Sequence, residues 1–124
     1  MLWAAETRVS CVRSKEMLEV MMDAGCIQLD FGVETGAPHL LDTINKKITV
    51  KQIKNAFALC RETGMRSFAN MLINLPGETE EMVENTICYA KKLAAQMSLF
   101  YLPVPYPGSD LFQICKETGA IREA

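Results

Sequence analysis

Closely spaced cysteines are absent from this chain of 124 residues. The five cysteines lie 15, 34, 28 and 27 positions apart, at Cys11, Cys26, Cys60, Cys88 and Cys115. No pair forms a Cys-x-x-Cys or Cys-x-x-x-Cys clip, so we expect no metal site of that local kind. An odd number of cysteines without a visible secretory signal is typical of reduced thiols, which predicts a cytoplasmic protein.

Charge of one sign and long apolar runs are also scarce. The 13 basic and 15 acidic residues are scattered and give a formal net charge of −2, which argues against a nucleic-acid module with a clustered basic face. The longest uncharged stretch, residues 93–109, contains three prolines and cannot cross a bilayer as a helix. We therefore expect neither nucleic acid nor a membrane as a partner.

What the chain does contain is an ordinary globular composition, with 49% apolar and 23% charged residues. A chain of this length buries roughly two-thirds of its unfolded surface, which is enough for a hydrophobic core without disulfide bonds or a bound metal. Composition alone predicts one soluble domain.

Short apolar runs alternate with longer stretches of helical periodicity, which is the pattern of βα units around a parallel sheet. The predicted strands cover residues 2–12, 27–33, 66–74 and 98–104. The predicted helices follow Ser14 and Pro38, and then cover residues 49–63, 79–94 and 110–118. The carboxyl ends of parallel strands share one edge of a sheet, so we expect the loops after the strands to be functional.

Capping residues and apolar stripes define two of these helices. Thr49 and Gln52 predict a capping box, and Thr79 predicts the start of the later helix. The residues expected on the buried face of that later helix recur at three- and four-residue steps: Val83, Ile87, Ala90 and Ala94.

Glu34 stands out in the loop after the second predicted strand, between Gly32 and Gly36. At a strand's carboxyl end its carboxylate could accept hydrogen bonds from a hydroxyl or amino group of a ligand. The same residue could equally be a solvated glutamate in a glycine turn. Spacing alone leaves both interpretations open.

Four motifs in a fixed order resemble the second half of a radical S-adenosylmethionine (SAM) enzyme. They are Gly32-Val33-Glu34-Thr35-Gly36, Leu41-x-x-Ile44-x-Lys46, Met71-Leu72-Ile73-Asn74-Leu75-Pro76-Gly77-Glu78-Thr79 and Pro105-Tyr106-Pro107-Gly108-Ser109. The resemblance covers nearly the whole chain and is greatest to the subgroup that often carries a cobalamin-binding domain. The resemblance implies an α/β fold, a partial parallel (β/α)6 barrel to which this chain contributes three to four βα units as its carboxyl-terminal half.

The resemblance implies contacts to SAM, and the candidate residues are Arg8, Glu34, Lys46, Asn70, Leu72 and Asn74. Glu34 matches a polar residue that contacts the ribose or methionyl part, and Lys46 matches the basic partner of the methionyl carboxylate. Asn70 matches a position that reaches the ribose. The strand from Leu72 to Asn74 matches the edge whose backbone hydrogen-bonds adenine. Arg8, on a strand with few charges, is a further candidate for the same pocket.

Each assignment has a simpler alternative. Lys46 and its neighbour Lys47 could be a solvated pair, and Asn70 could hydrogen-bond only to backbone. Where the family usually has glycine before Leu-Pro-Gly, this chain has Asn74, whose side chain could crowd adenine although Asn tolerates unusual φ values.

The family's Cys-x-x-x-Cys-x-x-Cys loop, which ligates the 4Fe-4S cluster, does not occur in these residues, and neither does the family's Gly-Gly-Glu segment. We therefore expect a fragment covering residues 1–124 that is inactive alone, with no assigned catalytic residue. We expect strands that are apolar on both faces, with Ile27, Leu29, Phe31 and Val33 on one side of the second strand, so the face toward the barrel interior needs cover. The expected partner is the missing half-barrel or a second copy.

Two alternatives remain open from the sequence. One is a non-catalytic module that binds a nucleotide or docks on a partner. The other is an unrelated flavodoxin-like α/β domain, and the order of strands in the sheet distinguishes it from a barrel, because only the flavodoxin-like order is switched.

Overall fold

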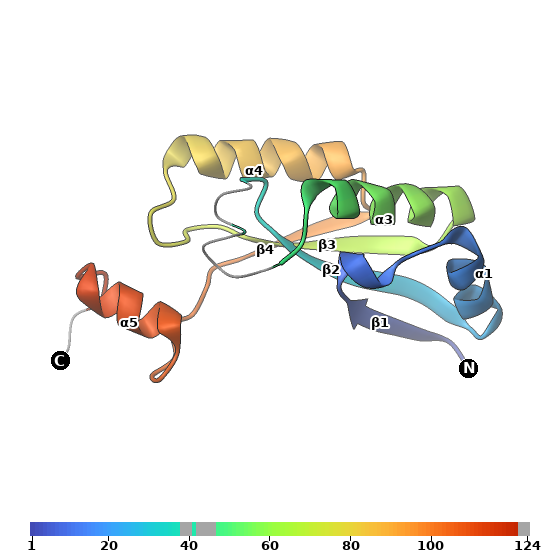
Figure 1. The fold of residues 1–124 in the computed structure, drawn as a ribbon, viewed down its shortest axis with the longest axis horizontal. Coiled ribbons are helices and arrows are strands. Elements are labelled where there is room, and N and C mark those ends of the chain that lie inside the picture. Colours follow the sequence, from blue (N-terminus) through green and yellow to red (C-terminus); the bar gives the residue numbers. More distant parts are fainter. Residues whose placement is uncertain (38–40, 42–46, 122–124) are drawn as a thin grey trace.

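The computed structural model describes residues 1–37, 41 and 47–121, and its centre is a four-stranded sheet (Figure 1). The strands are β1 (Trp3–Thr7), β2 (Cys26–Glu34), β3 (Arg66–Leu72) and β4 (Met97–Tyr101). They lie in sequential order, and each is parallel to the next. This order agrees with a barrel wall and contradicts the flavodoxin-like alternative.

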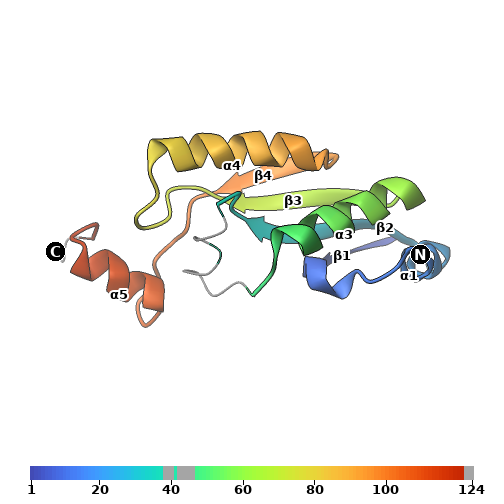
Figure 2. The ribbon, with the colours of Figure 1, turned by 45° about the horizontal axis from the view of Figure 1, so that its top comes forward.

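Helices cover one face of the sheet, as two views of the ribbon show (Figures 1 and 2). They are α1 (Lys15–Asp23), α3 (Val50–Thr63) and α4 (Glu80–Leu93). A fourth helix, α5 (Asp110–Glu117), has no buried residue and lies apart from the sheet in both views. In the described part of the chain, no helix has both the length and the apolarity that a membrane span requires.

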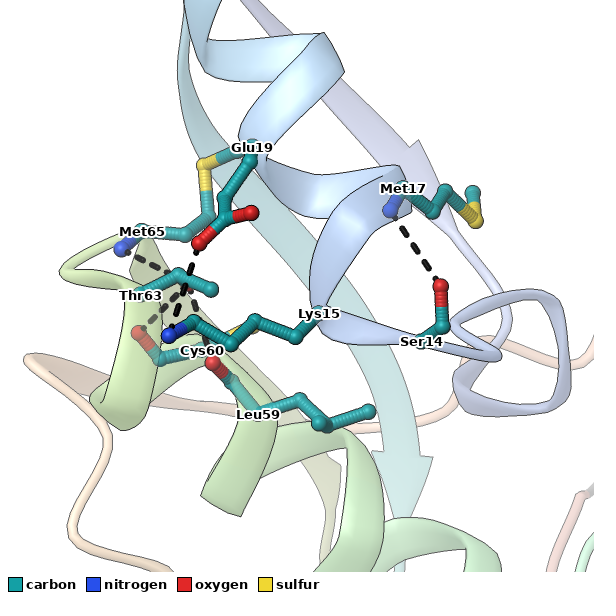
Figure 3. A network of polar contacts seen from close by, with 8 residues as sticks. All are labelled: Ser14, Lys15, Met17, Glu19, Leu59, Cys60, Thr63 and Met65. Carbon is teal, nitrogen blue, oxygen red and sulfur yellow. Dashed lines mark hydrogen bonds and ion pairs between the residues drawn. The ribbon is translucent and has the colours of Figure 1, made fainter.

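The predicted helix boundaries are confirmed by local hydrogen bonds. The Thr49 hydroxyl accepts from the Gln52 amide at 3.2 Å, and the Gln52 side chain accepts from the Thr49 amide at 2.8 Å, which completes the capping box. Ser14 caps α1 by accepting from the Met17 amide at 3.3 Å (Figure 3). At the other end of α3, the Thr63 hydroxyl donates to the Leu59 carbonyl at 2.9 Å. Such local signals can be read from short stretches of sequence.

The first strand is shorter than the predicted range 2–12. It ends at Thr7, and residues Val9–Cys11 form a 3-10 turn, η1. Val9 and Val12 are 1% and 4% exposed, so these apolar side chains turn into the core instead of extending the strand.

The core lies between the sheet and its helices. Phe31 of β2 and Phe57 of α3 pack edge to face with ring centroids 5.1 Å apart. Other fully buried members come from α1, α3 and β3, and include Leu18, Ile53, Cys60 and Met71.

The face of the sheet without helices is not apolar, so the expectation of two apolar faces is wrong for β2. Leu29, Phe31 and Val33 are buried against the helices, whereas Gln28 and Asp30, which alternate with them, are only partly buried. The Gln28 amide donates to the Asp30 carboxylate at 2.9 Å on this open face. Alternation of side chains along a strand therefore gives β2 one apolar and one polar face.

The buried stripe of α4 is also different from the predicted one. Its buried residues are Thr86, Ala90 and Leu93, whereas Ile87 is 37% exposed and Ala94 is the exposed C-cap. Thr86 was not predicted to be buried because threonine is polar. Its hydroxyl is nevertheless satisfied inside the protein, as described next.

Candidate functional site: a polar groove at the carboxyl edge of the sheet

The loop after β2 begins with strained backbone at Glu34. This residue has φ +72°, in the left-handed region that a residue with a Cβ rarely adopts. The register of β2 against β3 also shifts between Gly32 and Glu34, which is the signature of a bulge. A bulge changes the direction of the side chain that follows it. Backbone strain of the kind seen at Glu34 persists only where surrounding contacts hold the backbone in place.

Buried threonines from two distant segments fix this loop. The hydroxyls of Thr35 and Thr86 lie 3.1 Å apart, and both residues are fully buried. The amide of Gly36 donates to the Thr86 hydroxyl at 3.2 Å, and the amide of Ala37 donates to the Thr35 hydroxyl at 3.1 Å. These bonds attach the loop that carries Glu34 to α4.

Gly36 is required by this packing. A Cβ placed on it would lie 2.7 Å from the Cβ of Tyr89, closer than side-chain atoms approach in proteins. The glycine therefore allows the loop to contact α4 closely enough for the threonine hydrogen bonds to form.

Three of the predicted SAM-contacting residues lie together, on the open face of the sheet near the carboxyl ends of the strands. Arg8, Glu34 and Asn70 line one hollow of about 470 Å³. We call this hollow the polar groove; its other lining residues are Glu6, Thr7, Asp30, Gly32 and Tyr101. Residues from all four strands or the loops after them thus meet in one place.

The polar groove has an excess of acceptors. It holds the carboxylates of Glu6, Asp30 and Glu34 but only one guanidinium, that of Arg8. The Oδ1 atom of Asn70 is buried and has no hydrogen-bond partner among the described residues. A buried acceptor without a donor is costly, so this atom is suited to a donor carried by a ligand.

The other predicted residues lie elsewhere. Leu72 is the last residue of β3 and pairs with Tyr101, which borders the polar groove. Asn74 lines a different hollow, of about 480 Å³, between the Leu75–Glu78 loop and α5. Lys46 falls outside the described residues.

Asn74 adopts φ +66°, a left-handed conformation that glycine takes most readily. This conformation accounts for asparagine where the resemblance expects glycine, because Asn is among the few other residues that tolerate it. Asn74 is also exposed, and the loop after it is held by the Glu78 carboxylate, which accepts from the Leu75 amide at 3.0 Å.

The cysteines do not gather into a metal site. Within the described ranges, no group of three or more His, Cys, Asp or Glu side chains could hold a metal ion. Cys26 and Cys60 are buried in the core, and burial raises the pKa of the Cys60 thiol to about 11. Cys11 and Cys88 are exposed on separate segments. The residues described do not fit a 4Fe-4S cluster.

Sequence reasoning missed Glu6 and Asp30 as groove residues and Thr86 as the anchor of the loop. Strand alternation could have revealed Glu6 and Asp30. Asp30 lies an even number of residues from Glu34 along β2, and it pairs with Glu6 of β1. Thr86 lies 51 positions from Thr35, and a single sequence carries no signal for that pairing.

Comparisons with known proteins identify the family to which these features belong. Residues 4–90 match the family model of the Radical SAM superfamily. The chain belongs to this superfamily. It is 35% identical over 111 residues to the uncharacterized methyltransferase PH0819 of Pyrococcus horikoshii. This alignment covers 90% of the present chain and 24% of that protein. It is 34% identical over 113 residues to the anaerobic magnesium-protoporphyrin IX monomethyl ester cyclase of Rubrivivax gelatinosus, covering 90% and 20%.

A solved structure shows the same fold. The radical SAM methyltransferase TsrM of Kitasatospora setae, with cobalamin and a 4Fe-4S cluster bound, superposes with a TM-score of 0.79 at 23% identity, over 98% of this chain and 24% of that one. The predicted fold class, an α/β partial barrel of the radical SAM type, is confirmed. This radical SAM chain spans a quarter or less of the length of the proteins described here.

Proposed function

We propose that this chain supplies the part of a radical SAM barrel that contacts SAM. The convergence of Arg8, Glu34 and Asn70 on one groove carries the proposal, because separate strands deliver these residues to the open face of the sheet. Membership of the Radical SAM superfamily supports it, since SAM is the molecule on which this family acts.

The chemistry of the polar groove suits SAM. SAM carries a sulfonium and an ammonium cation, two ribose hydroxyls and one carboxylate. Glu34 and the Oδ1 atom of Asn70 would accept hydrogen bonds from the hydroxyls or the ammonium group. Arg8, with Lys46 as the residue predicted from the motif, would pair with the carboxylate. The excess of carboxylates favours the cationic end of the ligand.

In this family a 4Fe-4S cluster supplies the electron that cleaves SAM. The described cysteines do not fit such a cluster, so we propose that its ligands come from the rest of a longer chain or from a partner. The contribution of the present residues is binding and orientation. A cobalamin-binding domain, suggested by the fold shared with TsrM, would likewise lie outside these residues.

We also propose that the open face of the sheet faces the missing half-barrel or a second copy of the chain. The polar residues on the open face support this proposal. So does the outer edge of β1, because a strand edge without a neighbour tends to pair with another strand. Sedimentation velocity at micromolar concentration tests whether the chain self-associates. A strictly monomeric and folded chain would contradict self-association and leave the other half-barrel as the partner.

Equilibrium dialysis with radiolabelled SAM tests the binding proposal. We expect saturable binding by the chain, weakened about tenfold by Asn70→Ala, the loss of roughly 1.4 kcal/mol expected for one buried hydrogen bond. Glu34→Gln removes the negative charge. It should weaken the binding of SAM more than the binding of S-adenosylhomocysteine, which lacks the sulfonium charge.

Matched controls come from α3. Asn55→Ala and Glu62→Gln make the same chemical changes at exposed helix positions and should leave binding unchanged. If the folded chain binds no SAM, or if both pairs of variants lose binding equally, the proposal is wrong. The alternative of a docking module without a nucleotide site would then stand.

A further inference from the structure

A second groove lies on the helical side of the protein, between α3 and α4, away from the polar groove. Its volume is about 530 Å³. Three cationic side chains border it, Lys54 and Arg61 from α3 and Lys92 from α4. We call it the basic groove. It contains no acidic lining residue, although the chain as a whole has a net charge of −2.

The three cations are not neutralised within the described structure. All three residues are exposed, and the ion pair found among the described residues, Lys15 with Glu19 at 3.5 Å, involves none of them. Arg61 is held across the groove because one of its nitrogens donates to the Leu93 carbonyl at 2.8 Å. A guanidinium has five N–H groups, so this bond orients Arg61 and leaves further donors.

Helix dipoles account for part of this charge. Arg61 and Lys92 lie in the last turns of their helices, where each helix end carries roughly half a negative charge. Two helix ends therefore offset about one positive charge of the three, and about two remain. Lys54 lies near the start of α3 and has no such role.

Tyr89 lines the basic groove and carries a buried hydroxyl without a partner among the described residues. Burial raises the pKa of Tyr89, so the hydroxyl remains a proton donor at neutral pH. This donor can be satisfied only by an acceptor, and an anion is the acceptor favoured by the three cations that line the same groove.

The shape favours a peptide over a phosphate group. Phosphate sites commonly use the backbone N–H groups of helix N-termini, whereas most of this groove lies along the later turns of both helices. The cations are spread over two helices, and the apolar residues Phe57, Ala58 and Leu93 lie between them. Carboxylates spaced along a chain, with aliphatic stems over the apolar floor, match this arrangement.

We propose that the basic groove binds an acidic segment of a partner protein. Carboxylates of that segment pair with Lys54, Lys92 and Arg61, and one of them accepts a hydrogen bond from the Tyr89 hydroxyl. This site is separate from the polar groove, because the two linings share no residue.

The test uses a fluorescein-labelled octaglutamate peptide and the full chain, with binding followed by fluorescence anisotropy at low ionic strength. The double variant Lys54→Glu/Lys92→Glu should bind at least about tenfold more weakly, as expected for reversal of two paired charges. Lys51→Glu/Lys91→Glu is the control, since it makes the same charge change on the same two helices at exposed residues outside the groove lining. Circular dichroism confirms that both variants fold.

Tyr89→Phe should weaken the peptide severalfold while keeping its dependence on salt, because it removes a hydrogen bond and no charge. Equal weakening by both double variants would show nonspecific attraction and overturn the proposal. Absence of binding by the unmodified chain would overturn it too. Displacement of the peptide by an equal concentration of inorganic phosphate would identify a phosphate site instead.

Discussion

Replacing Thr86 by valine tests the buried threonine pair that holds the loop after β2. Valine has nearly the same shape, so the substitution leaves no large cavity and removes only the hydroxyl. The Gly36 amide loses its acceptor at 3.2 Å, and the Thr35 hydroxyl loses its contact at 3.1 Å with the Thr86 hydroxyl and keeps only the Ala37 amide. A buried polar group without a partner costs about 1–3 kcal/mol, and we expect the free energy of unfolding to fall by about 2–4 kcal/mol in total.

The matched control is Thr86→Ser, which keeps the hydroxyl and removes one methyl group. Its expected cost is about 1 kcal/mol, the value for one buried methyl group plus a small cavity. Urea unfolding followed by far-UV circular dichroism measures both free energies, provided that the dependence on urea is unchanged. Equal stabilities of the two variants would refute the argument, because the hydroxyl would then contribute nothing.

Four further outcomes follow from local geometry and burial. Gly36→Ala should lower the free energy of unfolding by about 1–3 kcal/mol in urea titrations, because its Cβ would lie 2.7 Å from the Cβ of Tyr89. Asn74→Gly should leave stability within about 1 kcal/mol in the same titrations, whereas Asn74→Ala should lower it by about 1 kcal/mol, because the left-handed φ of +66° suits alanine poorly. Burial raises the pKa of the Cys60 thiol from 9.0 to about 11, so the unfolded chain loses this proton first. Native stability should therefore decline as pH rises from about 9 to 11, and the decline should be smaller in Cys60→Ala. With a thiol-reactive dye at pH 8, exposed Cys88 should react and Cys60 should not, and equal labelling would contradict the burial of Cys60.

The features that the sequence predicts well are local ones. Helix caps depend on residues three positions apart, and the Thr49–Gln52 box forms as expected. The parallel direction of the strands follows from βα alternation, whereas their sequential order follows only from the resemblance to a barrel family. The caps and the parallel direction rest on short-range geometry that a single sequence contains.

The features that sequence reasoning misses depend on tertiary contacts. Thr86 is polar yet fully buried, because Thr35 and Gly36 supply its hydrogen-bond partners from another loop. The same pairing rotates the buried stripe of α4 away from the predicted one. Glu34 was recognised as a candidate by its motif, but its left-handed backbone follows from the bulge and the anchored loop, which no local pattern reveals.

The sequential order of the four strands has a consequence for how the chain assembles during translation. Each strand pairs only with strands that precede or follow it directly, so a ribosome delivers them in the order in which they join the sheet. Domains generally fold from the N-terminus during synthesis, and pairings between near neighbours form faster than distant ones. After β1 and β2 have paired, the free edge of β2 can receive β3 as soon as α3 has emerged. The Thr35–Thr86 bonds must wait for α4, so the loop with Glu34 is among the last parts of the sheet edge to acquire its native form.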